Sequence, residues 1–172
     1  MTKQSAGVVV YRFGLDGRLE VLIGHMGGPF WKNKDDGGYS VIKGEVEELE
    51  SDLTVAAKRE FREETGISID AELAHLGEFK QPSGKVIHVW ACEQEIDLSK
   101  FKPGEFEMEW PRGSGKLQRF PELDRIEWHT IPTAKRKVVK GQITVFDTLT
   151  KVLNYDSSSD PETDSDPQGS LF

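Results

Sequence analysis

The sequence contains a single cysteine, Cys92, and no apolar run that approaches the ~18 residues of a membrane-spanning helix. One cysteine excludes an internal disulfide and a zinc site built from cysteines. The first residues also lack the basic, apolar and small-residue regions of a signal peptide. At 172 residues, 36% of them hydrophobic, the chain can bury a core without crosslinks. We therefore expect a soluble, cytoplasmic protein with no membrane partner.

The end of the sequence has no basic residue after Lys151. That end carries −5 of the net charge of −8, and the preceding body, with 25 acids and 22 bases, carries −3. Such a balanced body has no basic footprint for duplex nucleic acid, so we expect no such partner. A single nucleotide is compatible with it, because one pocket can be positive on a mildly acidic protein. The acids after Lys151 are Asp156, Asp160, Glu162, Asp164 and Asp166.

The composition changes near Tyr155, where serine, aspartate and proline replace apolar residues until Leu171. A segment of this kind buries too little surface to offset the entropy that it loses on ordering. We therefore predict a folded domain over residues 1–154 and an acidic, disordered tail over residues 155–172. The sequence shows no internal repeat and does not indicate the oligomeric state.

Strand and helix patterns are mixed along the predicted domain. Two β-branched runs on either side of residues 14–17 predict a hairpin. Apolar residues at helical spacing predict a helix over residues 52–65 that ends at Gly66. Prolines and glycines predict an irregular segment over residues 103–121. The predicted strands are 6–13, 19–24, 39–42, 74–80, 85–92 and 126–131, and the other predicted helices are 133–139 and 142–153.

Three glutamates, Glu60, Glu63 and Glu64, share one face of the predicted helix over residues 52–65. At ~100° per residue, this face is also the one that carries the apolar residues of the helix. Glu60 and Glu64 repel each other at the i, i+4 spacing, and burial would deprive them of hydration. Arg59 can pair with Glu63, but it cannot neutralise all three carboxylates.

A divalent cation would resolve this conflict of charges. Oxygen-only ligands suit Mg²⁺ or Mn²⁺, which usually keep several water ligands and bind substrate phosphates as well. A solvated acidic face with incidental arginine pairs explains the same pattern. The helix geometry by itself therefore leaves both interpretations open.

The residues around these glutamates resemble the Nudix box of the Nudix hydrolases. The box reads Gly, five residues, Glu, seven residues, then Arg-Glu-apolar-x-Glu-Glu-x-Gly-apolar. In this chain Gly44 and Glu50 have that spacing, and the residues from Arg59 to Ile67, REFREETGI, fill every fixed position. The one departure is a gap of eight residues between Glu50 and Arg59, with the extra residue near Ser51.

The resemblance extends over residues 5–153 through segments such as SAGVVVYR, GPFWKNKDDGGYSVIKGE and EMEWPRGSGKLQRFPELDRIEWHTI. They are similar to a bacterial Nudix branch described as predicted NTP pyrophosphohydrolases, with some likeness to dinucleoside tetraphosphate hydrolases. The resemblance implies an α+β Nudix fold, in which a mixed β-sheet lies between helices in α/β/α layers. It also implies Mg²⁺-dependent hydrolysis of a phosphoanhydride, with Mn²⁺ able to replace Mg²⁺.

The substrates that the resemblance implies are nucleoside diphosphates linked to a second moiety. We expect NTPs or dinucleoside polyphosphates such as Ap4A as substrates, with oxidised nucleotides such as 8-oxo-dGTP as an alternative. A second alternative is a Nudix-like domain that binds a nucleotide as a sensor without turnover. Such domains usually lose box glutamates, whereas Glu60, Glu63 and Glu64 are all present here.

Position in the box implies the role of each residue. Glu60 and Glu64 are the main expected metal ligands, Glu63 completes the site directly or through water, and the carbonyl of Gly44 is a further ligand. Lys43 directly precedes Gly44 and is expected to hold a phosphate. For base stacking we consider Phe30, Trp31, Tyr39 and Trp90, each of which could equally be a packing residue.

Two further catalytic roles follow from the resemblance. Arg59 is expected to orient the carboxylates together with Glu50. A glutamate outside the box acts as the base or contacts the metal in several family members, shortly before the tryptophan of the last strand. Glu122, six residues ahead of Trp128, is our candidate for this role. Its competitors are Glu105, Glu107 and Glu109.

Overall fold

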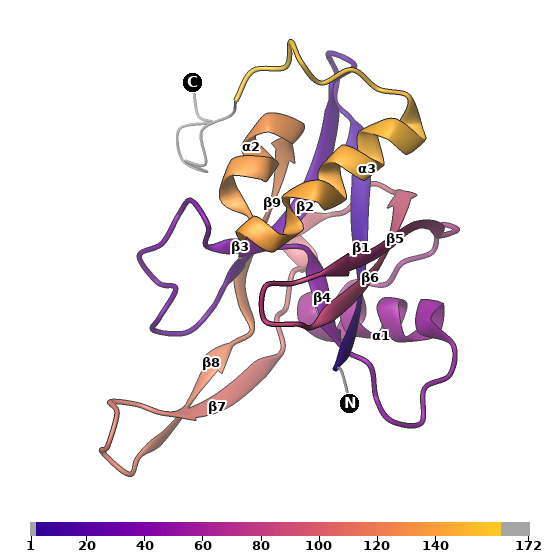
Figure 1. Cartoon of the computed structure of the whole chain (residues 1–172). Helices are drawn as coiled ribbons and strands as arrows, with labels where there is room; N and C mark the ends of the chain where they lie inside the picture. The colour runs from indigo at the N-terminus through magenta and orange to yellow at the C-terminus, as the bar shows by residue number, and fades with distance from the viewer. Residues whose placement is uncertain (1–2, 163–172) are drawn as a thin grey trace.

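The computed structural model describes residues 3–162, which form a mixed β-sheet with helices on both of its faces (Figure 1). Helix α1 (Leu53–Thr65) covers one face, and helices α2 (Ile131–Lys137) and α3 (Ile143–Leu153) cover the other. This α/β/α layering confirms the predicted fold class. Within residues 3–162, no helix is long and apolar enough to cross a membrane.

The central strand of the sheet is β1 (Gln4–Phe13). It is antiparallel to β2 (Leu19–Met26) and parallel to β6 (Val86–Glu93). Strand β5 (Ala74–Lys80) pairs antiparallel with β6 on its outer side, and β9 (Leu123–Thr130) pairs antiparallel with β2. The five corresponding predicted strands are confirmed, with ends that differ by up to three residues.

The strand predicted over residues 39–42 is divided into two. Strand β3 (Tyr39–Ser40) pairs with β2, and β4 (Ile42–Glu45) pairs antiparallel with the first half of β1. Val41 lies between them, and its N–H donates 2.7 Å to the side-chain oxygen of Gln142 instead of to a neighbouring strand. This side-chain bond explains the interruption. Two 3₁₀ turns, η1 (Leu98–Lys100) and η2 (Lys140–Gln142), complete the elements.

A hairpin of β7 (Glu105–Glu109) and β8 (Leu117–Pro121) protrudes from the body (Figure 1). The prediction of an irregular segment over residues 103–121 is therefore wrong. The prolines and glycines that suggested it lie at the ends of the hairpin and in its tip. Phe106 and Phe120 form a cross-strand pair with ring centroids 6.0 Å apart, which stabilises the hairpin.

Helix α1 has the ends that the sequence predicts. The carboxylate of Asp52 accepts a 3.0 Å hydrogen bond from the N–H of Thr54, which caps the first turn. Gly66 follows the helix with φ 73°, a left-handed conformation that glycine adopts without strain. Phe61 is fully buried against the sheet, so truncating it to alanine would cost about 3–5 kcal/mol. This anchoring holds the glutamates of α1 close to β4.

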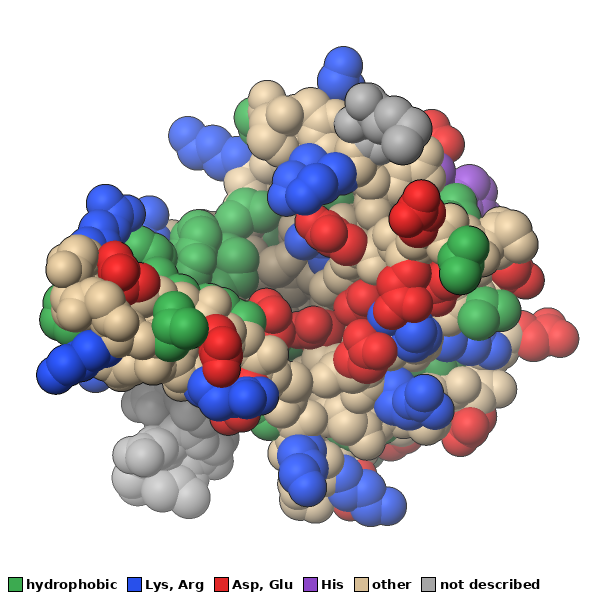
Figure 2. Space-filling view, turned by 90° about the horizontal axis from the view of Figure 1, so that it is seen from below, with side chains coloured by type: hydrophobic (Ala, Val, Ile, Leu, Met, Phe, Trp, Pro, Cys, Tyr) green, Lys and Arg blue, Asp and Glu red, His purple; other side chains and the backbone are tan. Residues whose placement is uncertain are grey.

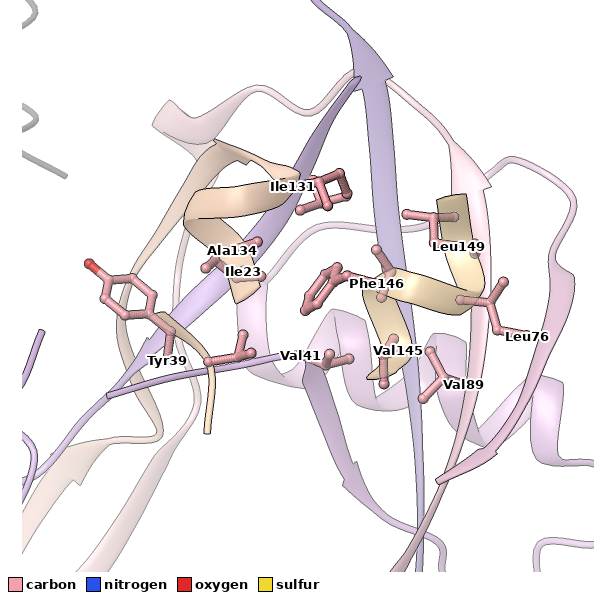
Figure 3. Close-up of a cluster of buried hydrophobic side chains, with 14 of the residues drawn as sticks. Ile23, Tyr39, Val41, Leu76, Val89, Ile131, Ala134, Val145, Phe146 and Leu149 are labelled. Carbon is pink, nitrogen blue, oxygen red and sulfur yellow. The ribbon is translucent and has the colours of Figure 1, made fainter. Parts of the chain in front are cut away.

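Apolar side chains fill the space on both sides of the sheet. Figure 3 shows the cluster beneath α2 and α3, where Phe146 and Leu149 pack on Ile23 and Val89 of the sheet. The second cluster lies beneath α1 and includes residues of β1, β4 and β6. Burial on both faces fixes the sheet as a rigid platform for the residues at its edge.

The first residues of the predicted tail, 155–162, pack on the domain. The hydroxyl of Tyr155 accepts a 3.1 Å hydrogen bond from the N–H of Leu19 and donates 2.7 Å to Asp160. This differs from the disorder expected from composition, because one aromatic residue anchors an otherwise polar segment. The other residues of the predicted tail, 163–172, lie outside the described residues.

Candidate active site

One cavity of about 440 Å³ collects the glutamates of the box-like segment. Its walls come from β1, β4, α1 and the residues that directly precede β6 and β9. Figure 2 shows acidic side chains gathered near the middle of this face of the molecule. We call it the carboxylate cavity, and it is lined by Ser5, Lys43, Gly44, Glu45, Glu60, Glu63, Glu64, Lys85 and Glu122.

Glu60 lies directly against the main chain of Gly44. A Cβ atom placed on Gly44 would be 1.8 Å from Oε2 of Glu60, so only glycine leaves room for this carboxylate. Glu60 is 7% exposed, and its burial raises the pKa of its carboxyl group, although Arg59 opposes the rise. Helix α1 and strand β4 therefore meet through a main-chain segment and a carboxylate.

Arg59 connects the carboxylates of the site. Its guanidinium forms two 2.7 Å bonds with Glu50, one of 2.8 Å with Glu60 and one of 2.9 Å with Glu63. The arginine lowers the pKa of Glu50 to about 2, because it donates to the charged form of that side chain. The extra residue between Glu50 and Arg59 thus does not separate the pair.

Glu64 faces another carboxylate across the cavity, that of Glu122. Burial, the charge of Glu122 and the charge of Glu60 together raise the pKa of Glu64 to about 8, against the attraction of Lys43. Burial also raises the pKa of Glu122. The pKa of Lys43 is lowered, chiefly by burial and then by Lys85. The cavity therefore holds more negative charge than its two lysines can balance.

The donors in the carboxylate cavity fit a hard divalent cation. All of them are oxygens, and the absence of a side chain on Gly44 lets a carboxylate and the main chain lie side by side. As placed in residues 3–162, no three His, Cys, Asp or Glu side chains converge closely enough to hold an ion. Arg59 instead binds one oxygen of Glu60 and one oxygen of Glu63.

Four glutamates outside the box are candidates for the base, and of these Glu122 lines the cavity. Its N–H donates 2.8 Å to the carbonyl of Gly104, and its own carbonyl accepts 2.9 Å from Gly27. The three competitors lie along the hairpin strand β7. Glu105 and Glu107 pair with Arg119, and Glu109 accepts from the N–H groups of Gly113 and Gly115.

The sequence comparison decides the family, because the model of the NUDIX domain matches residues 1–149. The chain belongs to the Nudix family. It is accordingly a hydrolase of phosphoanhydrides. No curated protein matches it in sequence.

Solved structures show the same fold at low sequence identity. The Ap4A hydrolase of C. elegans, in a binary complex, is 20% identical with a TM-score of 0.62, over 89% of this chain and 98% of that one. The NUDIX domain of Shewanella oneidensis NrtR, complexed with ADP ribose, is 12% identical with a TM-score of 0.60, over 89% of each chain. The MutT protein of Methanosarcina mazei is 13% identical with a TM-score of 0.54, over 88% and 95%.

The aromatic residues that sequence suggested for base stacking do not line the carboxylate cavity of this Nudix hydrolase. Tyr39 is fully buried, and its hydroxyl donates 2.8 Å to Glu127. Trp90 is 7% exposed and belongs to the core beneath α1. Trp31 is partly exposed on the loop after β2, with the ammonium of Lys34 5.3 Å from its ring centroid. Tyr39 and Trp90 are therefore packing residues.

Three residues that line the cavity are absent from the sequence prediction: Ser5, Glu45 and Lys85. Glu45 directly follows Gly44 and pairs with Ser5 across β4 and β1. Lys85 lies just before β6, and the parallel pairing of β6 with β1 brings it next to the start of β1. No local motif marks Ser5 or Lys85, so only a correct prediction of these strand pairings could have located them.

Proposed function

We propose that this Nudix hydrolase cleaves a phosphoanhydride bond of a nucleotide with the help of Mg²⁺. The proposed substrates are NTPs or dinucleoside polyphosphates such as Ap4A. The observation that supports this proposal best is the gathering of Glu60, Glu64 and Glu122 in one cavity with two lysines. Carboxylates hold a metal ion there and lysines attract phosphates, and phosphoryl chemistry needs both.

Glu60, Glu63, Glu64 and the carbonyl of Gly44 are the groups that would hold Mg²⁺ or Mn²⁺. When bound, the ion supplies positive charge to the phosphate oxygens during the reaction. The raised pKa values of Glu60 and Glu64 agree with a site that needs a cation to stabilise its ionised form. Arg59 is a positioning residue, because it fixes the carboxylates that line the cavity.

Substrate phosphates are held by Lys43 and Lys85, which line the same cavity as the glutamates. A substrate phosphate would give the ammonium of Lys43, which burial destabilises, a further anionic partner. Glu122 takes the proton of the attacking water. Its raised pKa suits a carboxylate that must accept a proton near neutral pH.

Product analysis of the purified full-length chain tests this function. The panel holds ATP, dGTP, 8-oxo-dGTP, Ap4A, ADP-ribose and UDP-glucose, each with Mg²⁺, with Mn²⁺ and with chelator. We expect metal-dependent cleavage of a triphosphate or of Ap4A, and H₂¹⁸O identifies the attacked phosphorus. Glu64→Gln should lose about 100-fold or more in rate, whereas Glu105→Gln on the hairpin should not. A nucleotide that binds but is never cleaved with either metal would favour the sensor interpretation instead.

A further inference from the structure

A second cavity, of about 570 Å³, lies beside the carboxylate cavity. It lies between the β7–β8 hairpin, the loop that follows β2 and the start of β9. We call it the aromatic cavity. The lining residues that matter here are Pro29, Lys32, Trp110, Gln118, Phe120 and Pro121.

Two glycines allow the loop to contact the hairpin. A Cβ atom on Gly27 would lie 1.9 Å from the carbonyl oxygen of Pro121, so no other residue fits there. Gly28 has φ +93°, and a Cβ atom on it would be 3.0 Å from the ring of Phe106. The N–H of Gly27 also donates 2.9 Å to the carbonyl of Glu122. The cavity wall is therefore built on close main-chain contact.

Aromatic contacts hold the far side of the cavity. Phe30 of the loop and Trp110 of the hairpin pack edge to face, with ring centroids 5.6 Å apart and planes at 79°. The guanidinium of Arg112 lies 5.0 Å from the centroid of Phe30. These contacts join the loop to the tip of the hairpin next to the cavity.

The chain just before the hairpin is attached to the end of α1. The N–H of Lys102 donates 2.8 Å to the carbonyl of Thr65, the last residue of α1. A Cβ atom on Gly104 would lie 2.9 Å from the carbonyl oxygen of Glu63. The same chain segment thus contacts α1 on one side and, through the hairpin, the aromatic cavity on the other.

The two cavities adjoin at consecutive residues. Pro121 lines the aromatic cavity and Glu122 lines the carboxylate cavity, and adjacent Cα atoms are ~3.8 Å apart. In Figure 2, acidic side chains occupy the middle of the face, and apolar side chains lie toward the lobe at its left. One molecule with an aromatic part and a phosphate part can therefore occupy both cavities.

We propose that the aromatic cavity binds the nucleobase of the substrate, while the phosphates occupy the carboxylate cavity. This inference rests on the proposed function and narrows it to substrates that carry a base, excluding phosphorylated sugars and inorganic polyphosphates. Trp110 and Phe120 offer ring faces on which a base stacks. Gln118 and Lys32 supply polar groups for its edge. The volume is within the range of small-molecule sites.

Tryptophan resonances provide a direct test, because the four tryptophans occupy different places. The experiment records ¹⁵N-indole spectra of the full chain with Mg²⁺ and α,β-methylene-ATP, and separately with Mg²⁺ and inorganic tripolyphosphate. We expect the indole resonance of Trp110, assigned with Trp110→Leu, to shift with the nucleotide and not with tripolyphosphate. Buried Trp90 should not shift with either. A larger shift at Trp31 or Trp90 than at Trp110 would overturn the proposal.

A matched pair of variants tests the energetics of the same contact. Phe120→Leu should weaken binding of α,β-methylene-ATP about 10-fold and leave binding of tripolyphosphate unchanged, since stacking contributes ~1–3 kcal/mol per base. Leu117→Ala is the control, because Leu117 is 68% exposed on the same hairpin and does not line the cavity. Equal loss for both ligands would mean that Phe120 only supports the fold, and would contradict the proposal.

The outcomes separate this inference from the proposed function. If the nucleotide shifts Trp110 but no member of the substrate panel is hydrolysed, the proposed base site is supported and the proposed function is contradicted. If nucleotides are hydrolysed but the Trp110 resonance does not shift, the proposed function is supported and the proposed base site is contradicted. Failure of the nucleotide to bind at all in the presence of Mg²⁺ contradicts both.

Discussion

The carboxylate of Glu60 occupies the space that a side chain on Gly44 would fill. The two residues lie 16 positions apart in sequence, on α1 and β4, and a Cβ atom on Gly44 would be 1.8 Å from Oε2 of Glu60. The contact joins the helix that carries the glutamates to the strand that carries Lys43. It therefore sets how closely the carboxylates of α1 and the ammonium of Lys43 can approach.

Gly44→Ala should consequently reduce activity without unfolding the protein. The added methyl group would push Glu60 away from the main chain of β4, and a displaced ligand or supporting group typically costs about 10–100-fold in metal affinity or activity. A Mg²⁺ titration of the hydrolysis rate measures the effect. Gly14→Ala on the β1–β2 hairpin is the control, because its Cβ atom would first meet the flexible side chain of Asp16 at 3.2 Å. Equal activity in the two variants would remove Gly44 from the site.

Arg59→Lys should lose activity although the positive charge is retained. Lysine cannot reproduce the two parallel bonds to Glu50 while also contacting Glu60 and Glu63. We expect a fall of about 10–100-fold in kcat, with little change in KM, because the arginine positions carboxylates and does not line the cavity. Arg62→Lys on the exposed side of the same helix should behave as wild type. A larger change in KM than in kcat would instead indicate that Arg59 contacts substrate.

The fold was predictable where local chemistry determines it. The cap at Asp52 and the left-handed Gly66 place α1 within one residue of its observed start, since both signals act on neighbouring backbone groups. The β7–β8 hairpin was missed because its prolines and glycines outweighed the alternation Glu-Phe-Glu-Met-Glu over residues 105–109. That alternation is a strand signal.

The site was predictable only in part, for a related reason. Residues that share one helix, such as Glu60 and Glu64, keep a spacing that the sequence displays. Lys85 enters the cavity through a parallel strand pairing, which no local pattern encodes. The aromatic residues show a further limit. Tyr39 is a stacking candidate in the sequence and Trp110 is not, because only burial distinguishes a packing ring from an accessible one.

The stability of the metal-free protein should fall between about pH 4.5 and pH 8. The pKa of Glu64 is raised from 4.5 to about 8 in the folded state, so the folded state binds this proton more tightly than the unfolded chain does. The resulting stabilisation is complete below pH 4.5 and is lost as the pH rises to about 8. Chemical denaturation in the presence of chelator, repeated at several pH values, measures this loss.

Glu64→Gln isolates the contribution of that carboxyl group. The carboxylate of Glu122 cannot repel the neutral amide. At pH 9 the free energy of unfolding of the variant should therefore exceed that of the metal-free wild type by about 1 kcal/mol, a value that allows for solvent screening. In a domain of this size that corresponds to ~2–4 °C in Tm. Saturating Mg²⁺ should remove the advantage, because it stabilises the ionised form only in the wild type. A variant that is less stable than the wild type at pH 9 would argue against a Glu64 carboxylate that is destabilised by burial and by Glu122.

Glu122→Gln should slow the chemical step more than it weakens nucleotide binding. The amide keeps the size of the side chain but cannot accept the proton of the attacking water. Single-turnover rates should fall by about 100-fold or more, within the range that positioned acid–base groups contribute, while the Kd for α,β-methylene-ATP changes little. Glu107→Gln serves as the control, because Glu107 lies on the hairpin beside Arg119. If Glu107→Gln gives the larger loss, the base belongs to the hairpin.

Ending the chain after Asn154 should destabilise the domain, although composition places the domain boundary there. Tyr155 is the partner of the N–H of Leu19, and Leu19 is fully buried. A buried N–H without a partner costs about 1–3 kcal/mol, and each kcal/mol lowers the Tm of such a domain by about 2–4 °C. Tyr155→Phe removes only the hydroxyl and should give part of the same loss, whereas Ser159→Ala, at an exposed position, should give none. An unchanged Tm in the shortened chain would show that residues 155–162 contribute nothing to folding, and would leave the boundary at residue 154.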